Sequence, residues 1–203
     1  SPCRRNFPHC PVFYQCKSPP WGANTAVERA QPCILGEKGD HELNNKTLSG
    51  WALILGASSG FGAACSRALA QAGMDIVGVH LDSKATLPRA QTVIDAIESV
   101  GQRALFFNAN AAHPHKRRSV LDAIQAEIGE RQIKVLLHSL AFGSLRPFVA
   151  DSPAESLTQS QMEMTLDVMA HSLVYWTQEL VWRNLFADDA RIYAMTSAGS
   201  HRV

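Results

Sequence analysis

Five short apolar runs alternate with helical patterns along most of this chain. The runs cover residues 51–55, 75–80, 103–108, 133–138 and 191–196. Each run is almost continuously hydrophobic, which is typical of strands covered on both faces of a parallel sheet. The pattern therefore predicts five buried strands.

Between the runs, apolar residues recur every three or four positions, as on one face of a helix. The first three patterns are expected to end at Gly73, Gly101 and Gly129, because glycine commonly follows the last turn of a helix. The fourth and longest pattern has apolar positions at Met162, Leu166, Met169, Leu173, Trp176 and Leu180. We expect this apolar face to pack into the core of the domain. The alternative is that it forms an interface between two copies of the chain.

Alternating strands and helices predict an α/β fold, a doubly wound parallel sheet of the Rossmann type with right-handed crossovers. We assign residues 47–203 to this domain and expect it to be incomplete at the C-terminus. Residues 1–46 hold six of the ten prolines and show no sustained apolar periodicity. They are predicted to be a disordered or poorly packed extension.

Four of the five cysteines lie in that extension. Their spacing fits no common zinc pattern, so incidental thiols are favoured over a disulfide or a zinc site that includes His9. The four are Cys3, Cys10, Cys16 and Cys33.

Composition excludes several classes of protein. The net charge of +1 gives no sign of a nucleic-acid partner. The basic run at residues 116–118, beside His113 and His115, is interpreted as a solvated helix face without a metal. No apolar run could span a bilayer, and early prolines argue against a signal peptide, so we expect a cytoplasmic protein without a membrane partner.

A glycine-rich segment follows the first predicted strand and precedes the first helix. Its spacing is G-x3-G-x-G over residues 56–62. Glycines there permit a tight turn and close backbone approach, and the helix N-terminus attracts a pyrophosphate. The context favours a nicotinamide dinucleotide over a turn without ligand. The predicted pyrophosphate residues are Gly56, Ser58, Ser59, Gly60, Phe61 and Gly62.

The end of the second strand should meet the adenine ribose. Asp82 favours NAD, because a carboxylate suits a free 2′-hydroxyl, whereas Lys84 favours NADP. Asp82 lies two residues beyond the usual place of an NAD-selecting carboxylate, so the sequence favours NADP slightly over NAD.

These residues resemble the short-chain dehydrogenase/reductase family, and most closely its enoyl-acyl-carrier-protein reductase branch. Residues 138–143 read His-Ser-Leu-Ala-Phe-Gly, similar to the His-Ser-Ile-Ala-Phe segment of that branch. Met169 stands where other members carry a catalytic-relay Asn. Residues 195–200 resemble the family's Ser-Ser-x-Gly segment. The resemblance covers about residues 48–203.

The resemblance implies further site residues. Asn110 would contact the adenine, with an ordinary turn residue as the alternative. Ser197 would support the substrate carbonyl, with Ser200 as second choice. The residues expected to flank the nicotinamide are Ser139, Leu140, Ala141 and Phe142.

The family's chemistry also needs a Tyr and a Lys after the fifth strand, spaced Y-x3-K or, in enoyl reductases, Y-x6-K. Tyr14, Tyr175 and Tyr193 all precede that position, and none has a Lys four or seven residues later. We therefore expect a fragment that is inactive alone, with an exposed apolar sheet edge and poor solubility.

The predicted function is that of an NAD(P)-dependent reductase of an enoyl thioester, as in fatty acid biosynthesis. The full-length protein would bind the dinucleotide and an acyl thioester and form a homo-oligomer. The alternatives are a keto- or hydroxy-group reductase, a non-catalytic dinucleotide-binding module, and a non-functional truncation product.

Overall fold

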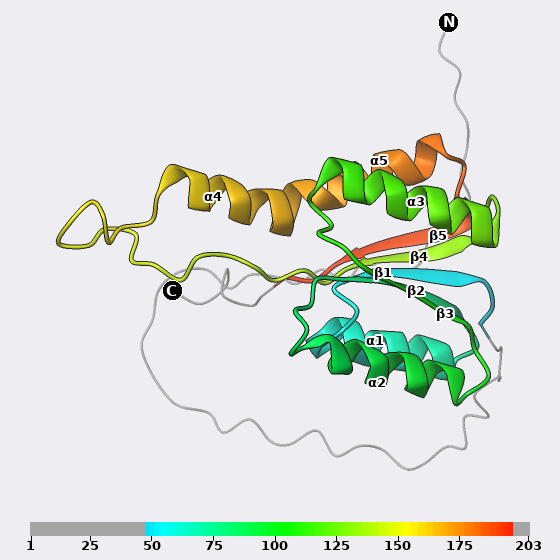
Figure 1. Ribbon diagram of the computed structural model, residues 1–203. Coiled ribbons are helices and arrows are strands. Elements are labelled where there is room, and N and C mark those ends of the chain that lie inside the picture. Colours follow the sequence, from blue (N-terminus) through cyan, green and yellow to red (C-terminus); the bar gives the residue numbers. More distant parts are fainter. Residues whose placement is uncertain (1–47, 197–203) are drawn as a thin grey trace, which may run out of the picture. The chain divides into compact units, whose positions relative to one another are not determined.

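Five parallel strands form a single sheet in the order β3-β2-β1-β4-β5 (Figure 1). The structure is a computed structural model, and it describes residues 48–196. The strands are β1 (Trp51–Leu55), β2 (Asp75–His80), β3 (Ala104–Asn108), β4 (Ile133–His138) and β5 (Phe186–Ala194). The predicted α/β fold with a parallel sheet is confirmed.

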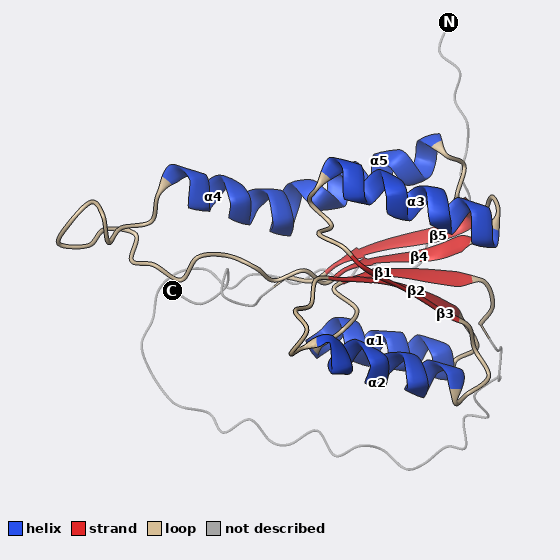
Figure 2. Cartoon of the chain, viewed as in Figure 1, coloured by secondary structure: helices blue, strands red, loops and turns tan. Residues whose placement is uncertain are grey.

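Helices cover both faces of the sheet. Figure 2 shows α1 (Gly60–Gln71) and α2 (Leu87–Glu98) on one face. The opposite face is covered by α3 (Pro114–Ile128) and α5 (Ser172–Trp182), and α4 (Gln159–Leu166) continues the line of α5 away from the sheet. The first three helices end before Gly73, Gly101 and Gly129, as predicted.

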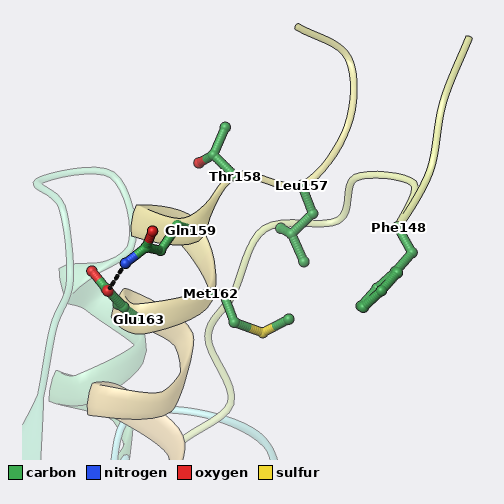
Figure 3. A pocket seen from close by; sticks show the side chains of 6 residues that line it. All are labelled: Phe148, Leu157, Thr158, Gln159, Met162 and Glu163. Carbon is green, nitrogen blue, oxygen red and sulfur yellow. Dashed lines mark hydrogen bonds between the residues drawn. The ribbon is translucent and has the colours of Figure 1, made fainter. Parts of the chain in front are cut away.

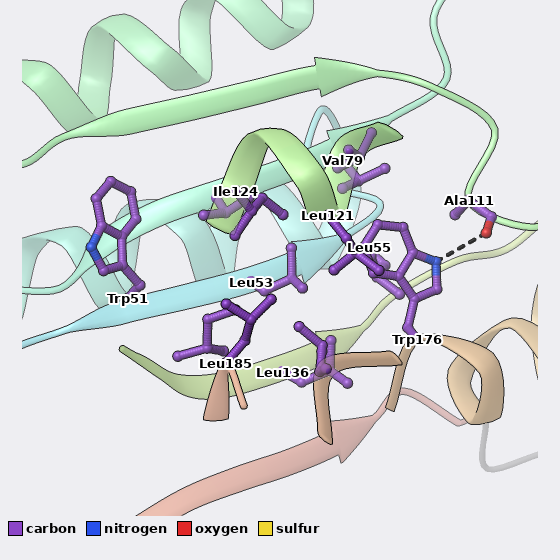
Figure 4. Close-up of a cluster of buried hydrophobic side chains, with 14 of the residues drawn as sticks. Trp51, Leu53, Leu55, Val79, Ala111, Leu121, Ile124, Leu136, Trp176 and Leu185 are labelled. Carbon is purple, nitrogen blue, oxygen red and sulfur yellow. Dashed lines mark hydrogen bonds between the residues drawn. The ribbon is translucent and has the colours of Figure 1, made fainter. Parts of the chain in front are cut away.

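Strand β1 supplies both halves of the core because its side chains alternate between the two faces. Leu53 and Leu55 pack with α3 and α5, whereas Ala52 and Ile54 pack with α1 and α2. Trp176 of α5 is fully buried on the face covered by α3 and α5. Its indole Nε1 donates to the carbonyl of Ala111 at 2.9 Å (Figure 4). A strand buried on both sides needs the continuous apolar run that predicted it.

Two elements differ from the prediction. The long helix is interrupted by a π-helical turn at Asp167–His171, where the backbone N–H of Ser172 donates to Asp167, five residues earlier. Strand β5 begins at Phe186 rather than Arg191, because Ile133 pairs with Phe186 and Val135 already pairs with Arg191. The register between β4 and β5 shifts between Ile133 and Val135, and Arg131 forms an ion pair with the exposed Asp188 in the added part of β5.

The strand order reverses between β1 and β4. From β1 the chain winds outward to β2 and β3, and then returns to β4 on the other side. In open parallel sheets, ligands bind beyond the carboxyl ends of the strands at such a switch point. The loops after β1 and β4 therefore mark the place to look for a site.

Candidate functional site

The glycine turn connects β1 to α1 at the switch point. Each of its glycines meets a different structural requirement. Gly56 has a φ of +92°, and a Cβ there would lie 2.3 Å from the carbonyl oxygen of Ser139. A Cβ on Gly62 would lie 2.0 Å from the carbonyl oxygen of Gly56. These two glycines let the turn pack against the β4 loop and against α1.

Gly60 differs from the other two, because a Cβ there would meet nothing within 4 Å at its φ of +54°. The residue is exposed at the first turn of α1. Open space over the free N–H groups of a helix N-terminus suits an incoming anion. Gly60 thus leaves room for a ligand rather than for another part of the protein.

Two serines border this space. Ser59 is the N-cap of α1, yet its side chain makes no capping hydrogen bond, so its hydroxyl is free for a ligand. Ser58 lies beside the carboxylate of Asp82, which links the glycine turn to the end of β2. Backbone hydrogen bonds from Gly56 and Ala57 to the Val79 carbonyl, at 2.8 and 3.1 Å, strengthen that link.

Asp82 is held as an anion at this edge. Its Oδ2 lies 2.7 Å from Nδ1 of the buried His80, and its side chain is only 9% exposed. Burial alone would raise its pKa, but hydrogen bonding by Ser58, Thr86 and His80 outweighs burial and lowers the pKa of Asp82 below its ordinary value. An ionised carboxylate only accepts hydrogen bonds, as from a ribose hydroxyl.

The other two residues of the predicted adenosine end are placed differently. Lys84 is exposed in the turn before α2. Asn110 is also exposed, and its side-chain oxygen accepts from the backbone N–H of Ala112 at 3.0 Å. That oxygen has a second lone pair for an adenine amine, so the turn role and the predicted ligand role are compatible.

The predicted nicotinamide segment follows β4, beside the glycine turn. The N–H of Ser139 donates to the Leu55 carbonyl at 2.8 Å, and Leu140 packs on the core. Ala141 and Phe142 are exposed in the loop after β4. Predicted Ser197, Ser200 and the cysteines of the extension lie outside the described residues.

A buried hydrogen-bond chain joins the end of β4 to the long helix. His138 Nε2 lies 2.8 Å from Oγ of Ser172, and that hydroxyl donates to the Val168 carbonyl at 2.8 Å. Because the hydroxyl has one proton, the His138 ring is the donor to it. This chain fixes the π-helical turn that carries the exposed Met169.

Two hollows lie elsewhere. One of about 240 Å³ lies between α4 and the loop before it, lined by Phe148, Leu157, Thr158, Gln159, Met162 and Glu163 (Figure 3). A larger apolar groove, of about 1010 Å³, runs between α1 and strands β4 and β5, with Leu69, Leu137 and Tyr193 among its lining. Neither contains a predicted site residue.

His80 and Asn108 were not predicted from the sequence to be parts of the site. The Asn108 side chain forms two hydrogen bonds with the backbone of Asp82, at 2.9 and 3.0 Å. Both residues end neighbouring strands of the sheet, and the carboxyl ends of parallel strands line the ligand crevice in folds of this kind. Polar residues at the ends of two predicted strands could therefore have indicated these two members of the site.

Together, the sheet order and the glycine turn at the switch point define a Rossmann-like fold. The sequence profile of the family described as enoyl-(acyl carrier protein) reductase matches residues 56–203. The chain belongs to the short-chain dehydrogenase/reductase family.

Individual relatives agree with this membership. A short chain dehydrogenase of Pseudocercospora fijiensis is 26% identical over 61% of the chain and 37% of the relative. A cyclohexanol dehydrogenase of an Acinetobacter species is 29% identical over 66% of the chain and 48% of the relative. A Burkholderia cenocepacia short chain dehydrogenase, solved in complex with NADP, superposes with a TM-score of 0.60 at 27% identity, covering 79% of this chain and 60% of that one.

The chain therefore spans less than half the length of these two curated relatives. None of the helices within residues 48–196 has the length and apolar character needed to cross a membrane.

Proposed function

We propose that this chain binds a nicotinamide dinucleotide at the glycine turn, with NADH preferred over NADPH. The observation that carries the proposal is the open, positively polarised space at Gly60, flanked by the free hydroxyl of Ser59 and the anionic Asp82. The pyrophosphate would lie at the N-terminus of α1, and the adenine ribose would reach Asp82.

The preference for NADH follows from charge. A 2′-phosphate beside the Asp82 carboxylate would be repelled by about 4 kcal/mol per charge pair at 4 Å in a protein-surface dielectric. Lys84 is solvent-exposed and screened. On this argument Asp82 outweighs Lys84, so the proposal prefers NADH, whereas the sequence slightly favoured NADP and the Burkholderia cenocepacia relative was solved with NADP.

We further propose that the whole protein reduces the carbon–carbon double bond of an enoyl thioester. The matching profile and the His138–Phe142 segment support this reaction over others of the family. The bound dinucleotide supplies the hydride, and residues 139–142 would hold its nicotinamide against the crevice. Reduction of a keto group, or oxidation of the corresponding hydroxy group, is the second candidate, supported by the cyclohexanol dehydrogenase relative.

The binding proposal is tested by titrating the 203-residue chain with NADH and following tryptophan fluorescence. Gly60→Ala should weaken NADH binding by about tenfold or more, because its methyl group enters the pyrophosphate space. Gly101→Ala is the matched control, since Gly101 also has positive φ and open surroundings but lies at the end of α2. Equal affinity in both variants, or no NADH binding by the parent chain, would refute the proposal.

The two reactions differ in the spacing of a catalytic pair. Sequencing the coding DNA beyond the Val203 codon should show a Tyr followed by a Lys seven residues later if the enoyl reductase proposal is right. A spacing of four residues would favour the keto- or hydroxy-group reductase. The 203-residue chain itself should bind NADH without oxidising it in the presence of an enoyl thioester.

A further inference from the structure

Asp82 follows the end of β2 by two residues, and such a position is free to move unless neighbouring groups hold it. Loops beyond strand ends are normally mobile and solvated. Here the Asp82 side chain is 9% exposed and accepts a 2.7 Å hydrogen bond from His80. Besides Ser58 and Thr86, two residues at strand ends hold it, His80 through the side chain of Asp82 and Asn108 through its backbone.

The side-chain contact comes from His80, the last residue of β2. Its ring is buried and lies against Phe106 of the neighbouring strand, with ring centroids 6.1 Å apart. A ring packed in this way has little freedom to turn, so its Nδ1 stays directed at Asp82. The hydrogen bond is charge-assisted, which makes it stronger than one between neutral groups.

The backbone contact comes from Asn108, the last residue of β3. Its Nδ2 donates to the Asp82 carbonyl at 2.9 Å, and its Oδ1 accepts from the Asp82 N–H at 3.0 Å. His80 and Asn108 are also register partners in the sheet, so both contacts come from the same paired strand ends. Asp82 is thereby fixed beside Ser58 of the glycine turn.

We infer that His80 and Asn108 are positioning residues that set the selectivity for NADH by holding the Asp82 carboxylate at the 2′-position of the adenine ribose. This inference rests on the proposed dinucleotide binding. A carboxylate that is fixed repels a 2′-phosphate at full strength and accepts a hydrogen bond from a 2′-hydroxyl. A carboxylate released into the loop does neither, because water screens it and its orientation is lost.

The test measures dissociation constants of NADH and NADPH for the 203-residue chain and its variants. The parent chain should bind NADH at least about tenfold more tightly than NADPH. His80→Leu removes the donor and should lower that ratio to about threefold or less. His80→Asn should restore it, because an Asn amide can place a donor near the position of Nδ1. Asn108→Ala should lower the ratio as well.

His171→Leu is the matched control for His80→Leu, because His171 lies exposed in the π-helical turn, away from β2. It should leave the ratio unchanged. The exposed Asn108 keeps the test valid if His80→Leu fails to fold.

The outcomes separate the two proposals. Folded His80→Leu and Asn108→Ala variants that keep the parent ratio would overturn the inference alone, as would an unrestored ratio in a folded His80→Asn variant. Equal binding of NADH and NADPH by the parent chain would overturn the NADH preference and the inference with it. A parent chain that binds neither nucleotide would refute the proposed function itself.

Discussion

At the scale of single residues, the site depends on polar groups whose partners are distant in sequence. His138 is an example, since its ring is 3% exposed and donates to Ser172, 34 residues away. Burial lowers the pKa of His138, and hydrogen bonding to the backbone of Val168 and of His138 itself offsets only part of that effect. The neutral ring is therefore the form that the fold requires.

This requirement predicts a loss of stability in mild acid. An unfolded His takes up a proton near pH 6.5, whereas folded His138 does so only at lower pH. The free energy of unfolding should fall as the pH drops below about 6.5, by at most about 1.4 kcal/mol per unit for this residue. The fall should continue until the folded-state pKa of His138 is reached.

Urea unfolding at several pH values between about 5 and 7.5 checks this, with His138→Gln as the comparison. The Gln variant should show a shallower pH dependence, because its amide cannot titrate but can place a donor near the position of Nε2 and still bond to Ser172. Asp82 titrates below this window, since its pKa is lowered. Parallel curves for the parent and the variant would contradict the prediction.

At the scale of elements, the long helix docks on the sheet through few residues. Trp176, Leu180 and Ser172 are its fully buried positions, whereas Val174, Val181 and Trp182 are exposed. The default prediction of a core-facing stripe thus applies to part of the helix. The alternative, an interface between two copies of the chain through this helix, stays a prediction, and the exposed apolar residues are compatible with it.

Trp176 should dominate this docking. Trp176→Ala should cost about 3–5 kcal/mol of unfolding free energy, because it empties a buried site and removes the bond to Ala111. Trp182→Ala provides a control of the same chemistry on the same helix, since Trp182 is 74% exposed, and it should cost less than about 1 kcal/mol. Thermal or urea unfolding compares the two, and similar losses would show that the helix is not anchored as described.

At the scale of the whole molecule, strand β5 is an edge of the described sheet. Ile192, Tyr193 and Met195 are 47%, 53% and 43% exposed, and Tyr193 also lines the apolar groove beside α1. Exposed apolar edges pair with other chains unless a charge prevents it. These apolar side chains of the described residues are therefore open to contact with another copy of the chain.

We predict that the 203-residue chain self-associates through this edge. Tyr193→Lys should shift it toward the monomer in sedimentation velocity, because the substitution puts a charge on the edge strand and in the groove. Val100→Lys, at a similarly exposed residue after α2, should leave the distribution unchanged. Equal effects of both lysines would mean that added charge, and not this edge, controls association.

The sequence by itself determined the strands, the sheet class and the glycine turn. The bounds of β1, β2 and β4 agree with the apolar runs that predicted them. Such features are local, because burial on both faces demands a continuous apolar run and a tight turn demands glycine. The family resemblance rests on the same contiguous segments.

Only the tertiary structure decided how residues from different strands combine. It joined Asp82 to His80, Ser58 and Asn108, the arrangement on which the proposed preference for NADH rests. It also placed a π-helical turn at Asp167–His171, fixed by a side chain from β4. The hydrophobic pattern of the sequence does not predict such contacts. Hydrogen bonds between strand ends depend on the order and register of the strands, which are not determined by neighbouring residues along the chain.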